Sequence, residues 1–270
     1  MEAEQTSVPS REAVDSATKL YNTIREGFPA AVEEFESRWA AARAVCKSQS
    51  FTPATGDDTL TRTDQFGALQ KLGPKIVPLV VFKLATDPAD ECSWAVLLYN
   101  ALENDPNYRP KPLGDEDLSR TSQSIVELNY QRNQLVEERV GIWKEYCDEN
   151  NICNHTNFLG MDEYLDLVEM GPSIIAHLMV QYRNSWSEAW FQLLHEINHG
   201  HRMVSIQYVP PLIFEGWCRW FNYGDQFNAP KYIPTALDRK IFSRYYGQNP
   251  ALEDSRPPAQ MQYSVTGVMD

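Results

Sequence analysis

The sequence predicts an all-α fold in which two HEAT-like three-helix units are joined by a long helix, with an N-terminal helical pair and C-terminal helices around them. Apolar residues recur at three- and four-residue intervals through most of the 270-residue chain, which is the spacing of amphipathic helices. Alternating strand-like patterns are nearly absent, and one helical stretch occurs twice. We expect a single all-α domain over residues 11–248, between a disordered start over residues 1–10 and a polar tail over residues 249–270.

The first expected elements are two helices that follow one another directly. Val14, Leu20 and Ile24 show helical spacing in the first of them. Gly27 and Pro29 divide the pair, because glycine readily ends a helix and proline is favoured in the first turn of the next.

The two predicted units cover residues 64–104 and 161–200 and share one sequence pattern. At a shift of 98 residues FGALQKLGPKIVPLVVFKLA lies over YLDLVEMGPSIIAHLMVQYR, and after a two-residue deletion WAVLLYNALEN lies over WFQLLHEINHG. In both copies a glycine can end one helix in a left-handed conformation and a proline can start the next. Each copy should therefore form three helices that need a neighbour to bury their apolar side.

Three further helices are expected outside the units. Residues 119–150 form one long amphipathic helix in this prediction, because apolar residues recur along it over about eight turns. A helix rich in aromatic residues is expected over 210–223, and a last one after an N-cap at Thr235.

Composition and charge disfavour several kinds of partner. The net charge of −13 argues against nucleic acid, whose phosphates need clustered Lys and Arg, and against anionic lipid. No apolar segment is long enough to span a membrane, and the N-terminal residues lack the pattern of a secretory signal. Five dispersed cysteines without a paired motif suit reduced thiols, so we expect a cytoplasmic protein.

The stretch LLHEINHGH contains an H-E-x-x-H pattern. On a helix this spacing directs His195 and His199 toward one metal ion and leaves Glu196 to activate water, with Glu215 as the candidate third ligand. Two observations weaken this zinc-hydrolase hypothesis: the first copy of the repeat has no metal ligands, and Gly200 is expected to end the helix at once. Zinc is therefore kept as the alternative, and we expect no cofactor.

The preferred hypothesis uses the same histidines without a metal. Four polar residues of the second copy are not repeated in the first: His177, His195, Glu196 and His199 stand where the first copy has Leu79, Tyr99, Asn100 and Glu103. His195 is the expected general acid or base, because histidine titrates near neutral pH, with His177, His199 and Glu215 as its polar supports. Glu196 is a further candidate catalytic residue, and orientation of a neighbouring helix is its alternative role. The expected cavity walls are aromatic, with an arginine at the polar end: Trp190, Phe191, Trp217, Trp220 and Arg219. Ordinary core packing and helix-end roles for these residues stay open.

The duplicated segments LGPKIVPLVVFKLA and MGPSIIAHLMVQY, each followed by a tryptophan, resemble a group of mainly fungal helical proteins over roughly residues 60–225. The resemblance implies the fold and transfers no catalytic residue. Such proteins in fungi sometimes belong to specialised-metabolite pathways, which agrees with a cofactor-free cyclase, isomerase or lyase acting on a hydrophobic small molecule. A third hypothesis is a non-enzymatic helical-repeat interaction protein, which predicts a shallow exposed groove instead of an enclosed aromatic cavity.

Overall fold

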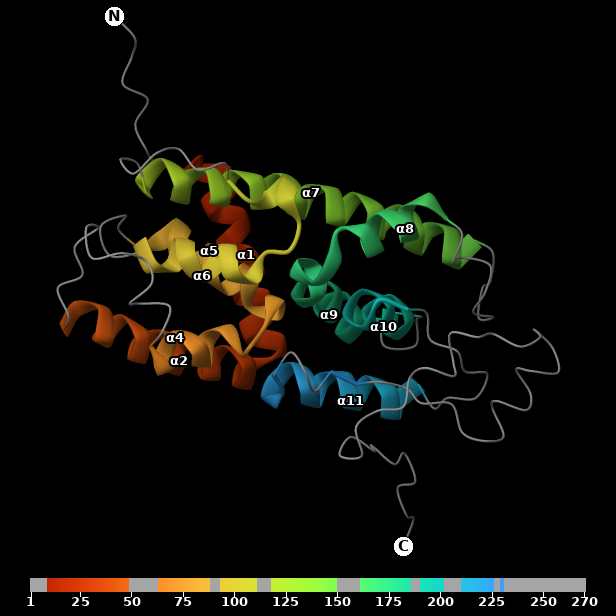
Figure 1. Cartoon of the computed structure of the whole chain (residues 1–270). Helices are drawn as coiled ribbons and strands as arrows, with labels where there is room; N and C mark the ends of the chain where they lie inside the picture. Colours follow the sequence, from red (N-terminus) through yellow and green to blue (C-terminus); the bar gives the residue numbers. More distant parts are fainter. Residues whose placement is uncertain are drawn as a thin grey trace, which may run out of the picture.

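Figure 1 shows the computed structural model; all the regular elements among the described residues are helices. The all-α prediction is therefore confirmed. The described residues are 9–48, 63–87, 93–110, 118–149, 161–185, 190–201, 210–225 and 229–230. The predicted helix after Thr235, the polar tail and residues 1–8 of the predicted disordered start lie outside these ranges, so those predictions stay untested.

The N-terminal helical pair is present, with the predicted division between its members. Helix α1 spans Arg11–Gly27, and its first turn is capped by the Ser10 hydroxyl, which accepts a hydrogen bond from the backbone N–H of Ala13. Helix α2 spans Pro29–Ser48, so proline occupies the first position of the second helix, where it needs no backbone N–H partner.

The two units have the same order of elements. The first unit consists of α4 (Asp64–Gln70), the 3₁₀ turn η2 (Pro74–Ile76), α5 (Val77–Thr86) and α6 (Ser93–Leu102). The second unit consists of α8 (Asp162–Glu169), the 3₁₀ turn η6 (Gly171–Ile174), α9 (Ile175–Asn184) and α10 (Trp190–His199). A short 3₁₀ turn, which the sequence did not predict, lies between the first and second α-helix of each unit.

The Gly-Pro turns of the two units also have the same backbone conformation. Gly73 and Gly171 have φ values of 75° and 70°, a region that residues with a Cβ rarely adopt. Ile76 and Ile174 share φ −92° and ψ −1°. The sequence repeat is thus a structural repeat at this level, while a HEAT-like arrangement of the units stays a prediction.

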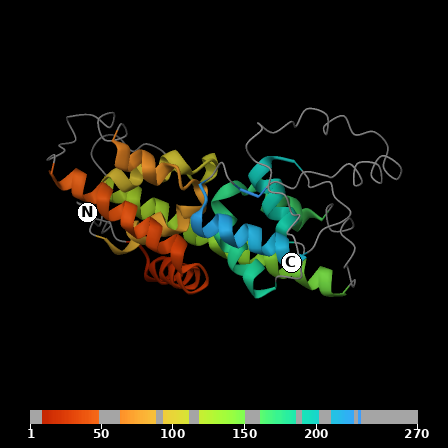
Figure 2. The same cartoon turned by 90° about the horizontal axis from the view of Figure 1, so that it is seen from below.

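The units meet at their turns and are held together by helices that contact both. η2 contacts η6, and α1 packs against α5 of the first unit and α9 of the second. Helix α7 (Leu118–Glu149) runs along both units and contacts α5 and α8 (Figure 1). Helix α11 (Pro210–Tyr223) packs against α2 and α9, and its blue ribbon meets the end of the red-orange α2 ribbon in Figure 2. Helix α7 begins and ends one residue before its predicted bounds, and α11 has the predicted bounds.

Aromatic side chains contribute much of the buried core. Trp190 is fully buried and makes a T-shaped contact with Trp143 of α7, with ring centroids 4.6 Å apart. Trp217 and Trp220 of α11 are also buried, with centroids 5.4 Å apart. Over the described part of the chain, no helix combines the length and the apolar character needed to cross a membrane.

Candidate functional site at the junction of the two units

A buried ion pair lies where the two units meet. Glu103 follows α6 and is inaccessible to solvent, and Arg132 of α7 is 2% exposed. The Arg132 Nη1 group donates to Glu103 Oε2 at 2.7 Å. Removing two charges from water is costly, and the pair is tolerable only if its remaining polar atoms are also satisfied.

Neighbouring groups complete the coordination of both charges. Glu103 Oε1 accepts from the hydroxyl of Ser173 in η6 at 2.9 Å and from the backbone N–H of Asp105 at 3.0 Å. A second Arg132 nitrogen donates to the side-chain oxygen of Asn129. The Asn129 amide donates to the hydroxyl of Tyr99 at 2.8 Å. The ion pair therefore joins α6, α7 and η6, which come from both units and the helix between them.

The segment after Glu103 folds over this ion pair. It contains the 3₁₀ turn η4 (Pro106–Tyr108), whose first N–H group, that of Asn107, is capped by the Asp105 carboxylate at 2.8 Å. The Tyr108 ring lies over the Arg132 guanidinium, 4.5 Å from ring centroid to Cζ. Burial raises the pKa of Tyr108 and keeps its phenol neutral. The Tyr108 ring thus covers one face of the Arg132 guanidinium.

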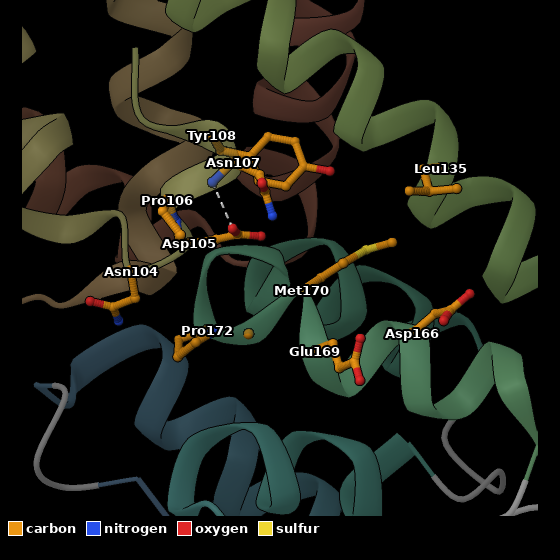
Figure 3. Close-up of a pocket in the computed structure, with 11 residues that line it drawn as sticks. Asn104, Asp105, Pro106, Asn107, Tyr108, Leu135, Asp166, Glu169, Met170 and Pro172 are labelled. Carbon is orange, nitrogen blue, oxygen red and sulfur yellow. Dashed lines mark hydrogen bonds between the residues drawn. The ribbon is translucent and has the colours of Figure 1, made fainter. Parts of the chain in front are cut away.

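An open groove of about 720 Å³ lies beside η4. Figure 3 shows three sides of it: the segment from Asn104 to Tyr108, Leu135 of α7, and the end of α8 with η6. Its carboxylates are Asp105, Asp166 and Glu169, and its apolar surface comes from Pro106, Tyr108, Leu135, Met170 and Pro172. One carboxylate is partly neutralised, since Asp166 pairs with Arg139 at 3.0 Å. The groove therefore combines negative charge with apolar surface at the junction of the units.

The structure brings the predicted histidines of α10 together and adds a third one. The ring centroids of His195 and His199 are 4.6 Å apart, and that of His201 lies 5.0 Å from His195 and 6.1 Å from His199. His195 Nδ1 is 3.2 Å from the carbonyl oxygen of His201, and His199 Nε2 is 2.8 Å from that of Pro230. α10 ends at His199, before Gly200 with φ 70°, as predicted.

The two predicted acidic partners of these histidines have other contacts. Glu196 accepts a hydrogen bond from the hydroxyl of Tyr164 in α8 at 2.8 Å. Glu215, the candidate third zinc ligand, forms an exposed ion pair with Arg219 at 2.9 Å. Among the described residues, no group of three or more His, Cys, Asp or Glu side chains is arranged to hold a metal ion. The zinc hypothesis thus gains no support from these residues.

The remaining predicted site residues lie in the core or beside another cavity. Phe191, Trp190, Trp217 and Trp220 are buried. His177 is also buried, and it lines a small cavity with Arg132 and Ser173. Burial lowers the pKa of His177 to about 4, because the charged imidazolium loses its hydration there.

Sequence reasoning missed the buried ion pair, although a signal for it exists. Asn129 and Arg132 continue the three- and four-residue spacing of Ile125, Val136 and Val140 along α7. Polar residues at core-facing positions of a helix need partners, so this position of Arg132 indicates a buried acidic group elsewhere. The structure also corrects one inference from the repeat: the first unit does place polar groups where the second has histidines, since Tyr99 and Glu103 are equivalent to His195 and His199.

Lys75 of η2 is a second buried charge that the sequence did not reveal. It is equivalent to Ser173 and is 4% exposed. Its Nζ donates to the carbonyl oxygens of Trp220 and Phe221 at 3.0 Å each, and to that of Gly224. Lys75 therefore caps the carboxyl end of α11, while burial lowers the pKa of its amine to about 7.

The fold and the groove define an all-helical protein built from two equivalent units around a buried ion pair. Comparison of the chain with models of protein families, with curated proteins and with solved structures finds no match.

Proposed function

We propose that the protein is a helical-repeat interaction protein that binds a basic, partly apolar segment of another protein in the groove beside η4. The open shape of this groove and its lining by both units support the proposal. An extended segment can lie in an open groove, whereas a small-molecule site is usually more enclosed.

The electrostatics of the groove select the partner. Three carboxylates line it, and the whole chain carries a net charge of −13. Complementary charge increases the rate of encounter and favours Lys- or Arg-containing segments over acidic ones. The apolar lining, with Leu135 and Met170, offers surface for neighbouring apolar side chains of the same segment.

The buried ion pair gives the groove a fixed shape. Glu103 accepts a hydrogen bond from the Asp105 backbone N–H, and the Arg132 guanidinium contacts the Tyr108 ring. These two contacts fix the position of the segment around η4. A preorganised surface loses less conformational entropy on binding than a mobile one. The burial of two charges at the junction, despite its desolvation cost, is consistent with a surface that must keep its shape.

Fluorescence anisotropy with labelled peptides tests the proposal. The probe is a peptide in which lysines alternate with leucines, and the control peptide has glutamate in place of lysine. We expect the lysine peptide to bind and the glutamate peptide not to bind, with affinity falling as salt is added. Equal binding of both peptides would contradict the proposed selectivity.

Two charge-reversal variants locate the binding surface. Glu169→Lys changes a groove residue at the end of α8, where a positive charge suits the helix dipole. Glu138→Lys makes the same change on an exposed position of α7 outside the groove lining. We expect at least a roughly tenfold loss of affinity in the first variant and little change in the second. Equal losses would assign the binding to overall charge.

The histidine cluster supports a second candidate, the acid–base enzyme predicted from the sequence. If His195 Nδ1–H and His199 Nε2–H donate to their carbonyl partners, the opposite ring nitrogens carry lone pairs. Such an arrangement suits proton abstraction. The hydrophobic substrate, the aromatic cavity and the absence of a cofactor all remain proposals for this candidate.

Nitrogen-15 NMR of the imidazoles tests the second candidate. A titration of His195 close to neutral pH would support acid–base work, and an imidazole that stays in one state from pH 5 to pH 8 would contradict it. Metal analysis of protein purified without chelators tests the zinc alternative. A zinc content well below one per chain would contradict it.

A further inference from the structure

Each unit has a small cavity beside its Gly-Pro turn, and the two cavities are lined by equivalent positions. Each cavity leaves about 10 Å³ for the centre of a water molecule. The corresponding residues are Ser173, Ile174 and His177 in the second unit, and Lys75, Ile76 and Leu79 in the first. The duplication therefore conserves the cavity but changes its chemistry from apolar at position 79 to an imidazole at position 177.

The imidazole of His177 lacks a hydrogen-bond partner at one ring nitrogen among the described residues. The residue is 6% exposed, and within the described part of the chain its Nδ1 atom has no hydrogen-bond partner. Buried polar atoms are nearly always satisfied, by protein groups or by ordered water. The cavity lined by His177 is the space from which a partner can reach this nitrogen.

The other polar groups around the cavity offer both donors and acceptors. The Ser173 hydroxyl gives its hydrogen to Glu103 and keeps lone pairs. The Asn133 amide nitrogen donates to Ser16 at 3.4 Å, which leaves its carbonyl oxygen as an acceptor. Arg132 uses one nitrogen on Glu103 and one on Asn129, out of five N–H groups in all.

We propose that this cavity is a binding site for one structural water molecule, which bridges His177 Nδ1 to the polar groups of the inter-unit junction. About 10–15 Å³ of such space is enough for one water, and a buried water makes about three hydrogen bonds. Water can donate to Nδ1 and to the Ser173 or Asn133 oxygen and accept from Arg132. A halide anion has no hydrogen to donate to His177 Nδ1 or to the Ser173 and Asn133 oxygens. A cation in the cavity would be repelled by the positive charge of the Arg132 guanidinium.

The proposed water site connects His177 to the buried ion pair of Glu103 and Arg132. Arg132 lines the cavity and also lies beneath the Tyr108 ring at the groove. The water therefore extends the ion-pair network from α7 to α9, and it ties His177 to the same network as Ser173. The proposal does not depend on the groove binding a partner.

A crystal structure of the full chain at about 1.8 Å or better tests the site directly. We expect one ordered water within hydrogen-bond distance of His177 Nδ1 and of at least one of Ser173, Asn133 and Arg132. Absence of density in the cavity would overturn the proposal. So would an anomalous signal from chloride or bromide in crystals soaked with the halide.

Two substitutions separate the water from simple packing. His177→Leu copies the residue at the equivalent position of the first unit, so we expect a folded protein without the water. His177→Asn keeps an acceptor close to the place of Nδ1, so the water should be retained. Where crystals fail, water-to-protein NOEs at residue 177 give the same comparison, and a signal of equal strength in the Leu and Asn variants would overturn the proposal.

Discussion

The Ser173 hydroxyl donates to Glu103 Oε1 at 2.9 Å, a direct hydrogen bond between the second unit and the end of the first. The equivalent residue of the first unit, Lys75, has a different task, because it caps α11. The turn of the second unit therefore stabilises the junction between the two units, and the turn of the first unit stabilises the junction with α11. Each junction depends on a buried charge that must keep its partners.

Glu103→Gln should strongly destabilise the protein. The substitution leaves the buried guanidinium of Arg132 without a counter-charge, a change that typically costs about 3–5 kcal/mol. Ser173→Ala removes only one of the hydrogen bonds to the Glu103 carboxylate, so we expect it to lower the free energy of unfolding by about 1–2 kcal/mol. Urea unfolding measures both values, and a Glu103→Gln loss no larger than that of Ser173→Ala would contradict the importance of the charge pair.

Gly171→Ala tests the backbone requirement of the repeated turn. A Cβ at this position would meet no atom within 4 Å, so its effect comes from the φ of 70° alone. We expect a loss of about 1–2 kcal/mol, the strain of a non-glycine residue in this region. Gly141→Ala is the matched control, because it adds a Cβ in similarly open space but within α7. There we expect a gain of about 0.5–1 kcal/mol, and thermal unfolding should move the two variants in opposite directions.

Lys75→Met should weaken the attachment of α11. Methionine keeps the length of the side chain but donates no hydrogen bond, so the buried carbonyl oxygens of Trp220 and Phe221 lose a shared donor. We expect a loss of about 1–3 kcal/mol and faster amide exchange at the end of α11. Lys71→Met, an exposed position before the same turn, should change neither. Unchanged exchange in Lys75→Met would show that the cap is dispensable.

Burial of neutral His177 predicts a pH dependence of stability. Its pKa is about 4 in the folded protein, against an ordinary value of 6.5 for an exposed histidine, so only the unfolded chain gains a proton between these values. Stability is therefore fully present above pH 6.5 and falls as the pH drops toward 4, by about 3 kcal/mol at most. Glu137 opposes the shift, while Lys19 favours it, and the Arg132 guanidinium faces the same cavity.

The His177→Leu variant isolates this contribution. Its unfolding free energy, measured against the unchanged protein from pH 7.5 to pH 4.5, should show a smaller decrease. Parallel curves for the two proteins would mean that other groups cause the acid sensitivity.

Local signals in the sequence determined the helices, the division between α1 and α2, and the duplicated turns. Gly73 and Gly171 act within a few residues of themselves, through the backbone conformations that only glycine adopts readily, so their effect is readable from the chain. The end of α10 before Gly200 follows for the same reason. Apolar spacing likewise predicted α7 to within one residue at each end, because periodicity depends on neighbours three and four residues apart.

Only the tertiary structure decided which polar groups meet. Glu103 and Arg132 are separated by 29 residues, and Lys75 reaches carbonyl groups about half the chain away. The spacing along α7 indicates that Arg132 needs a buried partner, but no local pattern identifies that partner, because the pair is stabilised by the exclusion of water at a junction that exists only after packing. For the same reason the H-E-x-x-H pattern fixed the proximity of His195 and His199 on one helix, whereas the fold alone placed Glu196 against Tyr164 and Glu215 against Arg219.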